Sequence, residues 1–142
     1  MNPNDKEFYD LIFAVNQDFY EQIYQDQWFK QVFKNITQEV ITSQQTDFMV
    51  QAFGGPSRYC GRMPGDAHPH IYIDEYMWDL REKYLKNSFK KHYVPQDIAE
   101  RWLKIDNAFK NKIIKKSIED VIPRFTTDEP VIVLRDQLKK AS

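Results

Sequence analysis

Glycine is scarce in this chain of 142 residues, and its four copies all lie between Gly54 and Gly65. Three of the seven prolines, Pro56, Pro64 and Pro69, lie in or next to the same window. Primed hairpin turns need residues that tolerate a positive φ, so a chain without glycine elsewhere is not built from many β-hairpins. The distribution instead predicts one irregular segment within an otherwise regular chain.

Other absences narrow the class of protein. The single cysteine, Cys60, excludes an intrachain disulfide and a cysteine-only zinc site. No stretch approaches 18 apolar residues, and the first 30 residues lack the basic-then-apolar pattern of a signal peptide. With 20 basic and 21 acidic residues, the chain has no overall field that would attract nucleic acid or an anionic membrane. We therefore expect a soluble, cytoplasmic protein without nucleic-acid or membrane partners.

Helical periodicity is the main positive signal. Apolar residues recur every three or four positions in four segments, which is the period of an amphipathic helix. These segments are residues 4–23, about 37–53, about 74–92, and from Pro95 towards Val121. Residues 24–34 read as a helix end and a short turn, residues 54–73 as a loop, and Val131–Leu134 as a short strand or docking helix. The sequence thus predicts an all-α domain with an aromatic core.

Two neighbouring glutamines interrupt the apolar stripe of the second predicted helix. Gln44 and Gln45 lie between Ile41 and Phe48, where the helical period favours apolar side chains. Burying an amide without a partner costs roughly 1–3 kcal/mol. Its partner is a facing side chain, a water or a ligand. The simpler alternative is that one glutamine points to solvent and the other hydrogen-bonds within the core.

His68 and His70 follow the glycine window. With one residue between them on a loop, they point in different directions, so at most one faces a given site; a chelating pair on a helix is usually four residues apart. A single imidazole suffices for a haem iron, since the porphyrin supplies the other nitrogens. A loop histidine is more commonly a surface or capping residue. Tyr20, beside Phe19, is able to bury its ring and direct its hydroxyl at a polar partner.

Taken together, these residues form a recognisable pattern. It comprises Phe19-Tyr20, Phe33, Gln44-Gln45, Phe48, the run AFGGPSRYCGR at residues 52–62 and DAH at residues 66–68. The sequence here resembles the truncated haemoglobins of the cyanobacterial, or group I, type, which fold two helices over two around haem. Looser similarity through Val94-Pro95 extends the resemblance to roughly residues 8–122. We expect a truncated globin domain at residues 1–125 and a C-terminal extension at residues 126–142.

The resemblance implies a bound haem b (iron protoporphyrin IX) and assigns residues to its two faces. His68 matches the proximal histidine that ligates the iron. Tyr20 and Gln45 match the distal residues that hydrogen-bond a bound ligand, and Gln44 lies where some members carry a distal residue able to swing in.

The resemblance also implies a set of haem-pocket residues. Phe33 and Phe48 match aromatic residues that wedge the haem, and Ile73 matches an apolar residue after the proximal histidine. Ile41 is apolar where many relatives are polar. Arg81 falls where relatives have valine or tryptophan on the proximal side; such a buried guanidinium must reach a carboxylate, a haem propionate or water. The glycine pair usual between the first two helices is missing, so one continuous helix is expected.

Three functions follow from this reading. The first is a haem protein that binds O2, NO or another diatomic ligand, with oxidation of nitric oxide to nitrate as its turnover and an unidentified reductase as its partner. The second is peroxidase-like or other redox chemistry at the same haem, although no distal histidine is apparent as a base. The third is a haem-free helical interaction or sensor module, for which Arg81 is the main argument.

Overall fold

The structure is a computed structural model, and it describes residues 1–61, 68, 70–122 and 131–133. Five α-helices and one 3-10 turn make up its regular structure: α1 (Lys6–Gln25), α2 (Phe29–Val32), α3 (Gln38–Ala52), α5 (Glu75–Lys91), α6 (Gln96–Ile113) and η1 (Ile118–Asp120). Within these residues there is no strand, only an isolated parallel bridge between Ile71 and Val131. The predicted all-α fold is confirmed. None of the described helices is both long and apolar enough to cross a lipid bilayer.

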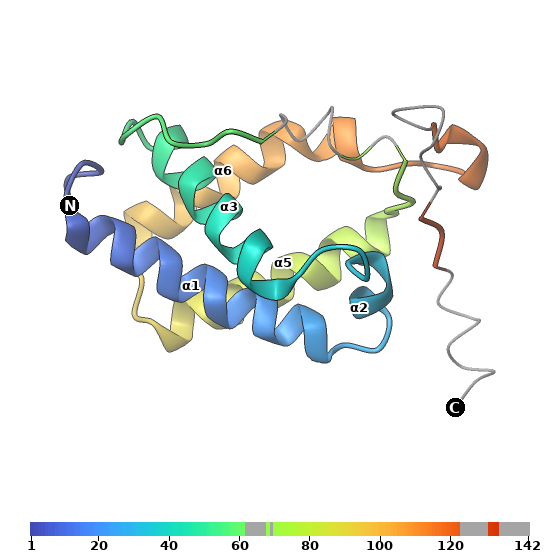
Figure 1. Ribbon diagram of the computed structural model, residues 1–142, viewed down its shortest axis with the longest axis horizontal. Helices are drawn as coiled ribbons and strands as arrows, with labels where there is room; N and C mark the ends of the chain where they lie inside the picture. Colours follow the sequence, from blue (N-terminus) through green and yellow to red (C-terminus); the bar gives the residue numbers. More distant parts are fainter. Residues whose placement is uncertain (62–67, 69, 123–130, 134–142) are drawn as a thin grey trace.

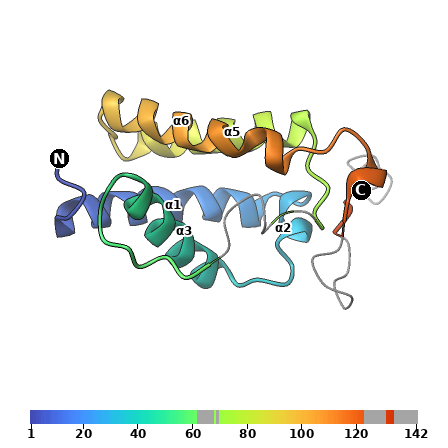
Figure 2. The same ribbon diagram turned by 90° about the horizontal axis from the view of Figure 1, so that it is seen from above.

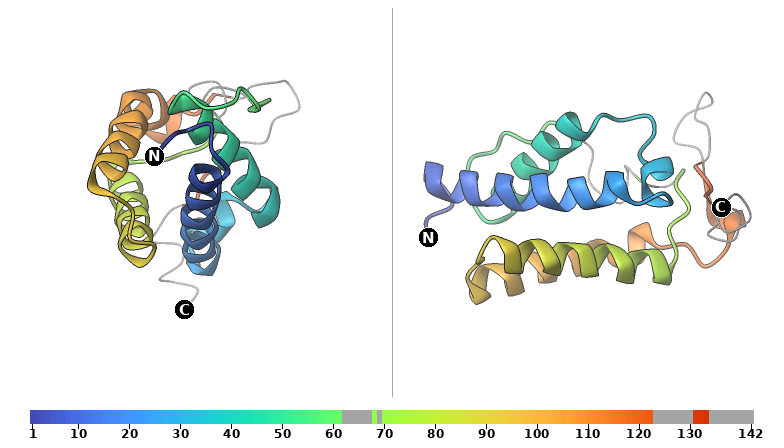
Figure 3. Two further views of the ribbon diagram at one scale, coloured as in Figure 1. Left: turned by 90° about the vertical axis from the view of Figure 1, so that its left-hand side faces the viewer. Right: turned by 90° about the horizontal axis from the view of Figure 1, so that it is seen from below.

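The helices form two layers (Figures 1 and 2). α1, α2 and α3 make one layer, and α5 and α6 make the other, with the long helices of the two layers facing each other (Figure 3). The predicted inward stripe of α1 is fully buried between them: Phe8, Ile12, Val15, Phe19 and Ile23 are each at most 3% exposed. The missing glycine pair leaves α1 as one continuous helix, as expected.

Local chemistry sets the ends of α3 and α5. The Thr37 hydroxyl accepts a hydrogen bond from the Val40 amide at 3.3 Å and caps α3. The Asp74 carboxylate accepts one from the Met77 amide at 2.8 Å and caps α5. Such side chains satisfy amides that have no partner inside the helix. Past the end of α3, Gly54 has a φ of +94°, a conformation that glycine adopts without strain.

Two predicted boundaries need correction. The fourth predicted helix ends at Ile113, not at Val121, because Ile114 is extended and the Lys115 amide bonds instead to the Ile73 carbonyl at 2.8 Å. Residues 24–34 contain the short helix α2 in addition to the expected turn.

The tail meets the body of the molecule at residues 131–133. The Val131 amide donates to the His70 carbonyl at 2.8 Å, and the Trp28 indole donates to the Val133 carbonyl at 2.8 Å. Residues 131–133 dock through an isolated backbone bridge and form neither the strand nor the docking helix that was expected for this run. Leu134 and the expected boundary between residues 125 and 126 lie outside the described residues.

Candidate functional site

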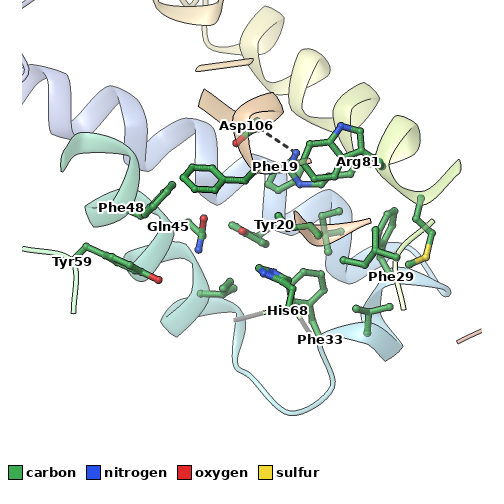
Figure 4. A pocket seen from close by; sticks show the side chains of 18 residues that line it. Phe19, Tyr20, Phe29, Phe33, Gln45, Phe48, Tyr59, His68, Arg81 and Asp106 are labelled. Carbon is green, nitrogen blue, oxygen red and sulfur yellow. Dashed lines mark hydrogen bonds and ion pairs between the residues drawn. The ribbon is translucent and has the colours of Figure 1, made fainter. Parts of the chain in front are cut away.

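A largely apolar cavity of about 100 Å³, partly open to solvent, lies between the two helix layers (Figure 4). Twelve of its lining side chains are aliphatic, aromatic or thioether groups: Phe19, Ile23, Phe29, Val32, Phe33, Ile41, Phe48, Ile73, Met77, Trp78, Phe109 and Ile113. Six carry polar groups: Tyr20, Gln45, Tyr59, His68, Arg81 and Asp106. An apolar cavity with a few placed polar groups is typical of a small-molecule or cofactor site.

The two glutamines of α3 have different surroundings. Gln45 lines the cavity, whereas Gln44 is exposed and does not line it. Ile41 and Phe48, one turn away on either side of Gln45, are buried in the same wall. No residue in the described part of the chain hydrogen-bonds the Gln45 side chain. Its amide therefore faces the cavity as a donor and acceptor without a partner among these residues.

Tyr20 brings a second polar group to the same space. Its ring packs edge-on against Phe19, with centroids 4.9 Å apart, and against Phe33 at 6.0 Å. Burial raises the pKa of Tyr20 far above its usual value, so the hydroxyl keeps its proton and remains a donor. Figure 4 shows this hydroxyl and the Gln45 amide directed at one part of the cavity, and no described residue accepts from the hydroxyl.

His68 also lines the cavity, at the start of the segment that leads into α5. Lys115 holds this segment in place, since its buried ammonium donates to the carbonyls of His68 and of Ile113, the latter at 2.8 Å. Burial lowers the pKa of Lys115 to about 8. Ile73, which lines the cavity, is fixed by its carbonyl bond to the Lys115 amide. His70 is buried nearby but does not line the cavity.

Arg81 finds its counter-charge on the other helix of its layer. Its Nη1 lies 3.1 Å from Oδ2 of Asp106, and both side chains line the cavity. Burial alone would lower the pKa of Arg81, but the carboxylate outweighs this effect, so the pKa is raised and the guanidinium stays charged. Of the three partners expected for this guanidinium, a carboxylate, a haem propionate or water, the structure supplies a carboxylate. In the view of Figure 4, Arg81 and Asp106 lie on one side of Tyr20 and His68 lies on the other.

Sequence reasoning had not singled out Asp106. It lies one turn after Trp102 on α6, and therefore on the inward face of that helix. A charged residue on an apolar helix face was the available signal, as a neutral polar residue at an apolar position was for Gln45. Tyr59 and Phe109 were also not expected in the wall; they pack edge-on against Phe48, with centroids 5.2 Å and 5.9 Å away.

The residues present fit a haem. Flat aromatic and aliphatic walls suit a porphyrin, and the cavity includes one histidine along with hydrogen-bond donors that have no described protein partner. Elsewhere in the described part of the chain, no three side chains of the metal-binding types converge on one point. His68 therefore suits a metal that arrives with most of its ligands already in place.

Comparison with known proteins agrees with this geometry. Residues 9–115 match the bacterial-like globin family. The chain is 29% identical over 87 residues to a group 1 truncated hemoglobin from Tetrahymena pyriformis, covering 61% of this chain and 72% of that protein. It is 27% identical over 92 residues to group 2 truncated hemoglobin 3-1 from Lotus japonicus, covering 63% of this chain and 45% of that protein. The crystal structure of the Tetrahymena pyriformis truncated hemoglobin in its Fe(III) form superposes with a TM-score of 0.66, at 26% identity, covering 74% of this chain and 90% of that one.

Proposed function

The chain belongs to the bacterial-like globin family, and from that premise we propose that it is a haem protein that binds O2 and related diatomic ligands at an iron ligated by His68. The observation that carries the proposal is the composition of one cavity. It combines apolar walls, a histidine, and two donors, the Tyr20 hydroxyl and the Gln45 amide, that no described residue engages.

The cofactor we propose is haem b, held without a covalent bond. Covalent attachment of the c type uses a C-x-x-C-H motif, and this chain has a single cysteine. When bound, haem would supply an iron that the His68 imidazole ligates and that binds a small diatomic molecule. Phe33 and Phe48 would pack on the ring, and Ile41 and Ile73 would complete the apolar surface.

Two groups of the chain act on the ligand in this proposal. The Tyr20 hydroxyl stays protonated, and the Gln45 amide reaches the same part of the cavity. Both donate hydrogen bonds to a ligand that gains negative charge when it binds, as O2 does. A hydrogen bond to a charged group contributes about 1.5–3 kcal/mol, or roughly a 10- to 150-fold change in affinity.

Oxidation of nitric oxide to nitrate is the enzymatic activity that we propose. The net conversion joins one O2 to one NO with one electron and yields one nitrate ion. The electron comes from a separate reductase, which is the protein partner this activity requires. The apolar cavity supports the proposal because it admits two small neutral gases. Equal yields of nitrate and consumed nitric oxide in the presence of an electron donor are the expected result.

The two alternative functions meet different structural conditions. Peroxidase chemistry needs a base on the ligand side, and His68 is the sole histidine among the described residues of the wall. The haem-free module was argued from a buried charge at position 81, and the ion pair with Asp106 accommodates that charge. Rates with peroxide and with nitric oxide, measured on the same preparation, separate the first alternative from the proposal.

The test is reconstitution of the full chain with haem, followed by reduction and measurement of O2 and CO dissociation. We expect uptake of one haem per chain, and O2 dissociation that is roughly ten- to a hundredfold faster in Tyr20→Phe. Tyr24→Phe is the matched control, because the Tyr24 hydroxyl bonds to the Ile36 carbonyl at 2.7 Å, outside the cavity wall. A chain that folds but takes up no haem, or that releases O2 equally fast in all three proteins, would refute the proposal.

A further inference from the structure

A partly buried ion pair forms part of the cavity wall. Arg81 of α5 and Asp106 of α6 meet at 3.1 Å, and their side chains are 26% and 11% exposed. Both line the cavity, so part of this exposed surface faces the cavity space (Figure 4). A buried pair contributes little stability relative to apolar residues of the same size, since both charges lose their hydration. The pair therefore calls for an explanation beyond packing.

The guanidinium of Arg81 is held in a defined orientation. Its central carbon lies 4.8 Å from the ring centroid of Trp78 and 5.5 Å from that of Phe19. Both rings are 3% exposed. Two aromatic faces and one carboxylate thus fix a planar cation within the wall, as cation–π and charge contacts do.

Arg81 has donors to spare. A guanidinium carries five N–H groups, and within the described chain a single hydrogen bond is made, from Nη1 to Asp106. The remaining N–H groups have no acceptor among the described residues. A planar cation with unused donors in a cavity wall is suited to hold an anion.

The cation lies close to the other donors of the cavity. Phe19, which packs on Arg81, is the neighbour of Tyr20 in the chain and contacts its ring at 4.9 Å. Burial has the largest effect on the pKa of Tyr20 and raises it, the charge of Arg81 lowers it, and the charge of Asp106 raises it by less than Arg81 lowers it. Arg81 therefore produces a positive potential at the tyrosine hydroxyl.

We propose that Arg81, oriented by Asp106, Phe19 and Trp78, acts on the Tyr20 side of the cavity and not on the proximal side that the resemblance implied. There it forms an anion-recognition site that favours small anionic haem ligands, of the nitrite and azide class, over neutral ones. The inference rests on the proposed haem function and adds a ligand class to it. A haem propionate is the other carboxylate that could pair with Arg81. The depth of the site, between two rings that are almost fully buried, favours the small anion.

The experiment compares azide affinity of the ferric haem protein with CO affinity of its ferrous form. The main variant is the double substitution Arg81→Met/Asp106→Leu, which removes both charges and leaves none unpaired. We expect azide to bind roughly ten- to a hundredfold more weakly, as for the loss of one charge-assisted hydrogen bond, and CO affinity to change less than about threefold. Asp106→Asn, which frees Arg81 of its counter-charge, should shift azide affinity in the opposite direction.

Lys110→Met is the matched control. Lys110 also joins α6 to α5, through Glu75 at 3.0 Å, but it does not line the cavity. Its azide and CO affinities should equal those of the unmodified protein. Azide and CO affinities that fall together in the double variant would overturn the proposal. Weaker haem binding with unchanged azide affinity would also overturn it and assign Arg81 to a propionate. Failure of the unmodified chain to bind haem would instead refute the proposed function.

Discussion

Gln44 and Gln45 are neighbours in the sequence with opposite surroundings, since Gln44 is exposed and Gln45 lines the cavity. One step along a helix turns a side chain by about 100°, so adjacent positions cannot both face a narrow cavity. Helical periodicity identified the pair as polar residues at apolar positions but could not choose between them. The rotation of α3 about its own axis decides which glutamine faces the cavity, and the packing of α3 against α1 sets that rotation.

This difference gives the first prediction. Gln45→Leu removes a donor from the cavity wall and should speed O2 dissociation from the reconstituted ferrous protein by roughly tenfold. Gln44→Leu makes the same chemical change at the exposed neighbour and should leave the rate as it was. Stopped-flow replacement of O2 by CO measures both. Equal effects from the two substitutions would contradict the assignment of Gln45 to the ligand side.

The role of Asp106 as the partner of Arg81 could not be predicted from the sequence. The sequence placed a cation at position 81 and required a counter-charge for it, but the partner lies 25 positions away on another helix. Several carboxylates occur along α6, and nothing local distinguishes the one that meets Arg81. Tertiary packing of α5 against α6 makes that selection.

At the scale of elements, caps and glycines set some helix ends and tertiary contacts set others. Thr37, Gly54 and Asp74 carry local signals, and α3 and α5 begin and end within a residue or two of their predicted limits. The end of α6 has no such signal, because it depends on a bond from Lys115 to Ile73, in the segment before α5. Helical periodicity alone therefore predicts a fourth helix that is too long at its C-terminal end.

Lys115 supplies the second prediction. Its ammonium holds the carbonyl of His68, so Lys115→Met should loosen the segment that carries the proposed iron ligand. We expect roughly tenfold faster loss of haem to an excess of an apo-globin acceptor. Lys116→Met is the control, since Lys116 is the exposed neighbour. Identical rates of haem loss in the two variants would show that Lys115 does not position His68.

Asp18 joins the two helix layers. Its carboxylate on α1 accepts from Ser88 and Lys91 of α5, each at 2.7 Å. Burial raises its pKa, but the hydrogen bonds from Lys91 and Ser88 outweigh burial, and the net pKa lies below the usual value. The carboxylate therefore stabilises the fold above the pKa of the unfolded chain, and this contribution is lost as pH falls through the folded pKa.

The third prediction follows from the lowered pKa of Asp18 in the folded protein. The free energy of unfolding of the unmodified protein should fall more steeply on acidification than that of Asp18→Asn, and the two should converge at the acid end. Urea unfolding at a series of pH values measures it. Asp10→Asn, at an exposed residue of the same helix that pairs with Lys6, should keep the steep acid dependence. Parallel pH profiles for the unmodified protein and Asp18→Asn would contradict the role of this carboxylate.

For the whole molecule, the fold class was the most predictable property. Four long periodic segments and one glycine window sufficed for an all-α domain, because each helix carries its own apolar stripe. The cavity was not predictable from those stripes alone, because they describe faces to be buried and not the space left between them. The family resemblance, rather than periodicity, directed attention to a cofactor.

The fourth prediction concerns stability of the whole chain. A ligand that binds only the folded state stabilises it by about 2.7 kcal/mol when its free concentration is a hundred times Kd. Haem should therefore raise the urea midpoint of the apo-protein in a concentration-dependent manner. A midpoint that does not move with added haem would mean that the cavity between the layers does not bind it.

The most direct test of the central claim is His68→Gly titrated with haem in the presence and absence of imidazole. We predict that the substitution removes the iron–histidine stretching band from the resonance Raman spectrum of the ferrous protein, and that added imidazole restores it by occupying the vacated space. His70→Gly, at a residue outside the cavity wall, should keep the band without imidazole. An unchanged iron–histidine band in His68→Gly would contradict ligation by this residue and with it the site proposed here.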